Sequence, residues 1–347
     1  MNIIKHLISS FFVLISAVVL ISSIIYLAPV DPARLTFGQR TDGASVERKR
    51  AELFLDKSLP VQMLYYLHDI SPIGYGDGSR YIERDIACLK IGGDKGLLLK
   101  EPYLRESYQT GRRVSSLLVN AIPKTLILAL VAILIAIFFG ILLGVSAALV
   151  KGTWLDTFII GFSVLGLSVP SYVSAILFAL VFGFLLKDYT GLNIQGSIFD
   201  LNDMGDEVIV LKNLLLPALA LGIRPLAIIT QLMRSSLLDV LSQDYMRTAL
   251  AKGLNFRNAV WKHGVKNALN PVFTAVTGWF ASLLAGSFFV EHVFNFKGVG
   301  GLTVNALINY DIPVLMACVI FVCIVFIVIN ICVDYGYRFF DPQLKNN

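Results

Sequence analysis

LDVLSQDYMRTALAKGLNFRNAVWKHGVKNALNP, residues Leu238 to Pro271, is a polar stretch that interrupts an otherwise membrane-like sequence. Its first half predicts a short helix, and Gly253 ends it, because glycine adopts the left-handed backbone conformation at a helix C-terminus without a side-chain clash. Asn255 then supplies the N-cap of a second helix. The stretch therefore predicts two short helices joined at an elbow between two hydrophobic spans. The more exposed charged members of the first helix are Asp244, Arg247 and Lys252.

An elbow of this kind suits docking into a groove on a partner protein, and a solvated connector between spans is the alternative. Its apolar residues favour docking, because they are poor solvent-facing side chains, although neighbouring spans can also cover them. These residues are Tyr245, Ala249, Leu254, Val260 and Trp261.

The composition is that of a polytopic membrane protein. Of 347 residues, 56% are hydrophobic and only 15% are charged, unlike an ordinary soluble domain. The net charge of +5 comes from basic residues scattered between loops, which argues against a nucleic-acid face. The four cysteines have neither a disulfide framework nor metal-ligand spacing with histidine or carboxylate, so no metal site is expected.

Six stretches are long and apolar enough to cross a bilayer, which needs roughly twenty such residues. The first is interpreted as a retained span and not as a cleaved signal peptide, because it lacks a convincing small-residue cleavage site. An even number of spans puts both termini on one side, and the basic residues of the short loops predict that this side is cytoplasmic. The stretches are Leu7 to Leu27, Leu117 to Val150, Leu155 to Leu186, Val208 to Met233, Val272 to Phe294 and Val314 to Tyr335.

A long loop from about Pro29 to Ser116 separates the first two spans. Its part from Ser45 to Asp69 is charged and predicted helical, and its part from Ser71 to Arg113 mixes glycine, tyrosine and charged residues.

Several features inside the spans have both a packing and a functional interpretation. Gly140, Gly144 and Ala148 share one helix face and allow close helix approach, within the bundle or in a dimer. Pro170 removes a backbone donor and predicts a kink. Arg224 is either functional or drawn toward the membrane interface by its long side chain.

The fifth span carries a stripe of small residues, Gly278, Ser282, Ala285 and Gly286, which suits either close helix packing or a translocation path at an interface between subunits. Glu291 follows at its outer end, as a gating group or as an ordinary interfacial carboxylate.

DYMRTALAKGL followed by KHGVKNALNPV resembles the cytoplasmic coupling loop of type I ABC importer permeases, in the peptide and nickel branch. Arg247, Thr248 and Ala249 occupy the Glu-Ala-Ala part of the wider family's motif, and Gly253 its glycine. Ser168, Pro170 and Ser171 match a Ser-x-Pro-Ser sequence of the family. The likeness extends across essentially the whole chain.

This resemblance implies an all-α polytopic membrane protein with six transmembrane helices in the type I ABC importer permease fold. Residues 1–114 would form the first span and a long extracytoplasmic loop, and residues 115–347 the transmembrane domain, with the coupling loop at about 238–271. The implied ATPase-coupling residues are Asp244, Tyr245, Arg247, Thr248, Ala249, Lys252, Gly253, Leu254 and His263. Candidates for the translocation path are Ser168, Pro170, Gly278, Ser282, Gly286 and Glu291.

The same resemblance implies the partners: a second related permease subunit, two cytoplasmic ATPase subunits that use ATP and Mg²⁺, and an extracytoplasmic substrate-binding protein. The long loop would contact this binding protein, and the alternative is that the loop is a folded extracellular cap with no specific partner. The chain has no phosphate-binding loop, so we expect it to be neither an enzyme nor a cofactor carrier. Its function would be import of peptides or a related small solute across the cytoplasmic membrane. The alternatives are an ion-coupled secondary transporter built on Arg224 and Glu291, or a membrane scaffold that uses the elbow only for docking.

Overall fold

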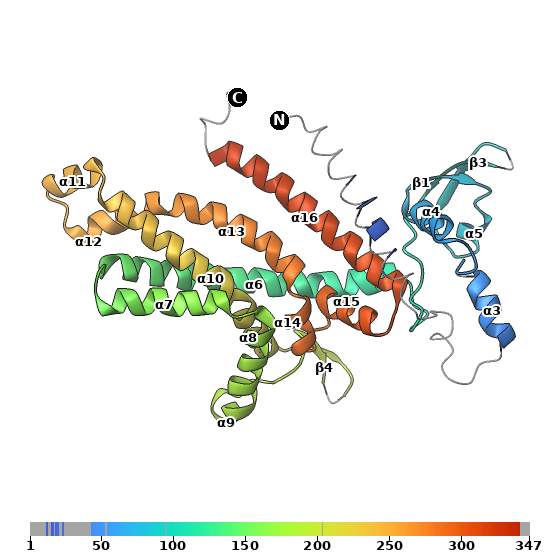
Figure 1. Ribbon diagram of the computed structural model, residues 1–347, viewed down its shortest axis with the longest axis horizontal. Coiled ribbons are helices and arrows are strands. Elements are labelled where there is room, and N and C mark those ends of the chain that lie inside the picture. Colours follow the sequence, from blue (N-terminus) through green and yellow to red (C-terminus); the bar gives the residue numbers. More distant parts are fainter. Residues whose placement is uncertain are drawn as a thin grey trace. The chain divides into compact units, whose positions relative to one another are not determined.

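The computed structural model describes residues 12, 15–16, 18–20, 23, 43–52, 54–93, 95–202 and 204–340 (Figure 1). Most of the predicted first span, and the whole stretch from Pro29 to Pro32, lie outside these residues. The chain divides into two compact units: Met1–Ala121 with Leu302–Ile324, and Ile122–Gly301 with Val325–Asn347.

The chain is mostly helical. Three helices run through both units: α6 (Val114–Leu149), α15 (Val299–Ile308) and α16 (Ile312–Phe340). The other helices of the second unit are α7 (Trp154–Ser168), α8 (Ser171–Phe178), the π-helix η1 (Ala179–Leu185), α9 (Lys187–Thr190), α10 (Lys212–Leu241), α11 (Asp244–Ala251), α12 (Phe256–Ala259), the π-helix η2 (Val260–Val265), α13 (Lys266–Gly286) and α14 (Phe288–Val293).

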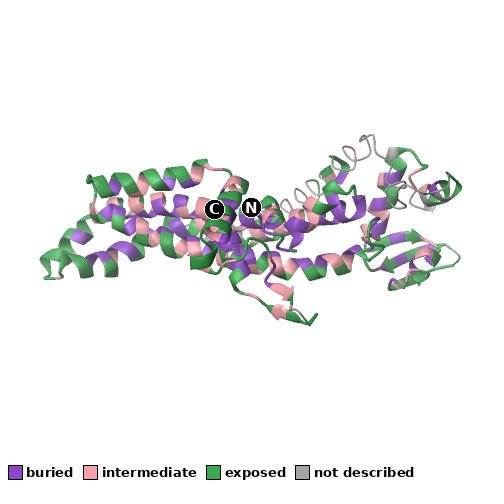
Figure 2. Ribbon diagram, turned by 90° about the horizontal axis from the view of Figure 1, so that it is seen from below, coloured by how far each residue is buried: buried purple, intermediate pink, exposed green. Residues whose placement is uncertain are grey.

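Helix α10 is the packing centre of the second unit, where it contacts α7, α8 and α13. Glycines let helix α6 approach it closely: a Cβ atom at Gly140 would lie 2.7 Å from Ile229 Cγ2, and one at Gly144 2.6 Å from Met233 Cβ. The small face of this helix is thus used for packing inside the bundle, which confirms that interpretation. Buried and exposed residues alternate along the bundle helices, as expected for partly covered helices (Figure 2).

Among the described residues, three helices are long and apolar enough to cross a membrane: α6, α10 and the part Ile312–Cys332 of α16. A fourth candidate is the pair α7 and α8 with η1, bent by 106°. The bend lies at Pro170, as the sequence predicts. Helix α13 is not among them, and its first half carries polar residues such as Asn267 and Asn270. The count of six spans stays a prediction.

The long loop folds into a small domain, here called the cap (residues 43–113). Its predicted helix from Ser45 to Asp69 is two helices, α3 (Gly43–Glu52) and α4 (Leu59–Ile70). Between them the backbone turns at Phe54, whose φ is +58°. A short helix α5 (Ser79–Ile82) follows.

The all-α expectation needs a correction, because the chain contains short strands. In the cap, β1 (Ile73–Gly76), β2 (Cys88–Ile91) and β3 (Gly96–Lys100) form an antiparallel sheet in the order β1-β3-β2. In the second unit, β4 (Phe199–Leu201) and β5 (Glu207–Ile209) form a hairpin before α10. The central strand β3 alternates buried and exposed residues, so one face of the cap sheet covers a core around Leu98, which is 1% exposed.

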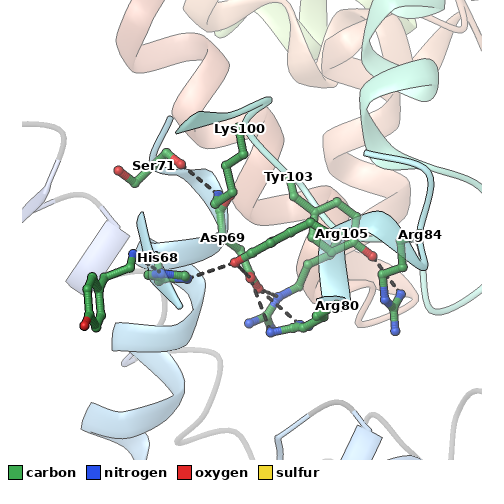
Figure 3. Close-up of polar contacts among 10 residues, drawn as sticks. His68, Asp69, Ser71, Arg80, Arg84, Lys100, Tyr103 and Arg105 are labelled. Atoms are coloured by element: carbon green, nitrogen blue, oxygen red, sulfur yellow. Dashed lines mark hydrogen bonds and ion pairs between the residues drawn. The ribbon is translucent and has the colours of Figure 1, made fainter. Parts of the chain in front are cut away.

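Asp69, fully buried at the end of α4, organises the polar interior of the cap (Figure 3). Its carboxylate accepts hydrogen bonds from Arg105 Nε at 2.9 Å and from the Tyr81 hydroxyl at 3.0 Å. Lys100 Nζ donates to the Asp69 backbone oxygen at 2.6 Å, and burial lowers the pKa of this lysine. A buried charge needs such partners, because an isolated one is costly to remove from water.

The segment just before α6 is bound to the turn between α15 and α16, two hundred residues further along the chain. Asp311 is buried there, and its carboxylate accepts from the Ser107 hydroxyl and, at 3.0 Å, from the Tyr108 backbone N–H. The first unit therefore joins the cap to the start of the last helix.

Candidate functional site

The elbow, residues 238–271, lies at one end of the bundle (Figure 1). Helix α11 ends at Ala251, and Gly253 follows with a φ of +91°, a left-handed conformation that a side chain would strain. The Asn255 side chain accepts from the Asn258 backbone N–H at 2.9 Å and caps α12. The structure confirms both the glycine stop and the asparagine cap.

One side of the elbow is fixed to the bundle by buried apolar contacts. Met246 is 2% exposed, and Val260 packs in a core that includes Leu237 of α10. A Cβ atom at Gly264 would lie 3.1 Å from Leu237 Cδ1, so the π-helix η2 also lies close against α10. The elbow is therefore packed directly against the central helix of the second unit.

The elbow also presents large apolar side chains to solvent. Of the five apolar elbow residues that the sequence predicts to avoid water, only Val260 is buried, and Ala249 and Leu254 are partly buried. The other two, Tyr245 and Trp261, are exposed. Exposed large apolar residues of this kind, here called the elbow patch, are typical of a protein contact surface. Its members and exposed fractions are Tyr245 (42%), Leu250 (39%), Phe256 (55%) and Trp261 (48%).

The charged residues of α11 are exposed, as predicted. Asp244 and Arg247 form an ion pair at 3.6 Å, but their side chains are 96% and 78% exposed, so the pair adds little stability. Thr248 and Lys252 are also exposed, and His263 is partly buried. Exposed polar groups and the exposed apolar residues of the elbow patch therefore alternate along this stretch of the chain.

An ion pair that the sequence analysis missed ties α7 to α10 just before the elbow. Arg234 Nε and Nη2 each lie 2.6 Å from a different oxygen of Asp156, and Gly152 N–H donates to the same carboxylate at 3.0 Å. The Asp156 side chain is 6% exposed. A two-pronged contact of this geometry fixes orientation as well as distance, so it ties α7 to α10 at this point.

The candidate path residues do not form one cluster. Ser168 and Pro170 are exposed at the bend between α7 and α8, and Gly278 and Ser282 are exposed on α13. Gly286 is the last residue of α13. Helix α8 contacts α14, where the Tyr172 and Phe289 rings meet with centroids 6.3 Å apart.

Glu291 differs from these residues in being fully buried, in α14. Its carboxylate accepts from the Thr125 hydroxyl at 2.9 Å, the Ser287 hydroxyl at 2.7 Å and the Gly301 backbone N–H at 3.0 Å. These contacts anchor the turn between α14 and α15 against α6.

The apolar helices and the elbow at their end define a helical-bundle membrane protein with exposed apolar residues on the elbow. Comparison with known families gives the particular assignment. The family described as the inner membrane component of binding-protein-dependent transport systems matches residues 140–346, and the N-terminal family of the same component matches residues 1–129. The chain belongs to this family and is therefore a permease component and not an ion-coupled carrier.

Relatives match over almost the full length. The chain is 30% identical to a dipeptide transport system permease of Bacillus subtilis, covering 98% of both proteins. It is 32% identical to a glutathione transport system permease of Pectobacterium atrosepticum, covering 99% of this chain and 98% of that one. The inward-facing methionine ABC transporter MetNI shares the fold, with a TM-score of 0.52 and 17% identity over 65% of this chain and 96% of that one.

Proposed function

We propose that this chain is one of two permease subunits of an ATP-driven importer, and that the elbow is its docking site for a cytoplasmic ATPase. The observation that carries this proposal is that the elbow exposes the large apolar residues of the elbow patch and also packs other residues onto α10. ATP and Mg²⁺ would be used by the ATPase subunits alone.

The second permease would be a related but different chain, and each permease would engage one of two ATPases. ATP binding would draw the ATPases together and move both elbows, and the permease interface would open outward to receive substrate. The Asp156–Arg234 contact would carry this movement into α7 and toward the bend at Pro170.

This mechanism requires the elbow and both termini to lie in the cytoplasm and the chain to span the inner membrane six times. The cap then lies outside, where it would meet a substrate-binding protein. Ser168, Pro170, Gly278, Ser282 and Gly286 are proposed to line the path, whereas the buried hydrogen bonds of Glu291 suit an anchoring role.

The substrate is proposed to be a peptide or a related small solute, because the relatives are named for dipeptide and glutathione transport.

Co-purification from detergent with the candidate ATPase and second permease tests the docking site. Ala249→Asp places a charge on the partly buried side of α11 and should abolish ATPase retention, while the permease pair survives. Ala44→Asp is the matched control, since Ala44 is exposed on α3 of the cap. Retention of the ATPase by Ala249→Asp at the wild-type level would contradict the proposal.

A further inference from the structure

Arg224 is a charged residue near the middle of a helix that is long and apolar enough to span the membrane. Lys212 precedes it by twelve residues and Arg234 follows it by ten, which at 1.5 Å per residue gives distances of about 18 and 15 Å along the helix. The hydrocarbon layer is about 30 Å thick. If the two flanking charges mark its edges, Arg224 lies close to the midplane, too deep for its side chain to reach either surface.

The guanidinium of Arg224 has a defined position, and one of its nitrogens lacks a hydrogen-bond partner. It lies over the Trp279 ring of α13, 5.9 Å from the ring centroid, in a cation–π contact. Its Nε is buried without a hydrogen-bond partner. Arginine stays protonated in proteins, so the charge cannot be removed by titration.

No carboxylate of the described residues neutralises this charge within 4.0 Å. Where the structure describes burial, the second unit has two buried carboxylates, and both are used elsewhere: Asp156 is bound by Arg234, and Glu291 by hydroxyl and backbone donors. A charge within a membrane span that has no internal counter-ion marks a functional site by default.

We propose that Arg224, held by Trp279, binds the carboxylate group of the transported substrate as it passes the middle of the membrane. A guanidinium binds a carboxylate through two parallel hydrogen bonds. The part of α13 beside Trp279 suits a passing polar molecule, because Gly278 and Ser282 are exposed and nothing lies within 4 Å of a Cβ atom at Gly278. This proposal rests on the proposed function. The alternative is that Arg224 binds a carboxylate side chain of the second permease and not the carboxylate of the substrate.

The test uses the purified complex of two permeases and two ATPases without the binding protein, whose own selectivity would otherwise mask that of the permease. Equilibrium binding is measured for radiolabelled trialanine and for trialanine amide, which differ only in the terminal carboxylate. Wild type should prefer the carboxylate about tenfold or more, as expected for hydrogen bonds to a charged group. Arg224→Gln should remove the preference, and Arg224→Lys should keep part of it.

Lys187→Gln is the control, since it removes an equal charge from the exposed helix α9 and should keep the wild-type preference. Equal binding of the two peptides by wild type, or no binding of either, overturns the proposal without any variant. Dissociation of the permease pair in Arg224→Gln, seen by gel filtration, also overturns it and identifies the second permease as the source of the carboxylate. Retention of the ATPase by wild type is measured on the same sample. If the ATPase is retained, a negative result in the binding assay counts against the role of Arg224 and not against the proposed function.

Discussion

The contact between Asp156 and Arg234 gives the sharpest prediction on stability. Asp156→Asn keeps the shape of the side chain but removes its charge and one of the two acceptors for Arg234. Breaking a fully buried ion pair costs about 3–5 kcal/mol, and exposed pairs contribute about 0–1 kcal/mol. Since the Arg234 side chain is 27% exposed and the Asp156 side chain 6%, we expect a loss of about 2 kcal/mol. For a unit of this size that lowers the melting temperature by about 5 °C.

Thermal unfolding of the purified permease in detergent, followed by intrinsic fluorescence, measures this change. Arg234→Gln should cost a similar amount, and the double variant should cost much less than the sum, because the same interaction is lost once. Asp244→Asn is the control, as it breaks the exposed pair with Arg247 and should leave the melting temperature unchanged. Additive losses in the double variant would refute the assignment of a coupled pair.

Three further predictions follow from packing, burial and hydrogen bonding. Gly144→Ala should lower the free energy of unfolding by about 1–3 kcal/mol through overpacking against α10, whereas Gly161→Ala, with nothing within 4 Å of the new methyl group, should raise the unfolding free energy by up to about 1 kcal/mol. Burial raises the pKa of Tyr81 and of Tyr103. The stabilisation from their neutral forms should therefore be complete below about pH 10, where unfolded tyrosine ionises, and should be lost as pH rises through the raised pKa values. Tyrosinate absorbance should show two late-titrating tyrosines, which Tyr81→Phe and Tyr103→Phe remove in turn. Asp311→Ala should speed hydrogen exchange at the Tyr108 amide about tenfold, because that N–H loses its buried acceptor; unchanged exchange would show that the contact is not formed.

The features that the sequence predicted well depend on residues close together in the chain. The elbow follows from the left-handed conformation of Gly253 and from Asn255 as the N-cap of α12, both of which are local features. The bend at Pro170 follows from the missing backbone donor. The packing face of α6 follows from glycines at helical spacing.

The features that the sequence did not predict depend on distant partners. Asp156 and Arg234 are 78 residues apart, and nothing in either local pattern indicates the other. The contact of Asp311 with Ser107 joins residues 204 apart. The cap strands are only four or five residues long, and β1 contains two glycines, so their alternation is too weak to separate from a loop. Arg224 stood out as a charge in an apolar span, but its contact with Trp279 required the packing of α10 on α13.

Cross-linking in membranes tests the central claim most directly. Cys88, Cys318, Cys323 and Cys332 would first be replaced by serine, so that only an introduced cysteine can react. Thr248→Cys, at an exposed position of α11, should then form a cross-link to the ATPase subunit whose yield changes when ATP is added, while Ala44→Cys in the cap should give none. Absence of a cross-link from Thr248→Cys in a complex that transports normally, or a cross-link from Ala44→Cys in its place, would contradict the assignment of the elbow as the ATPase docking site.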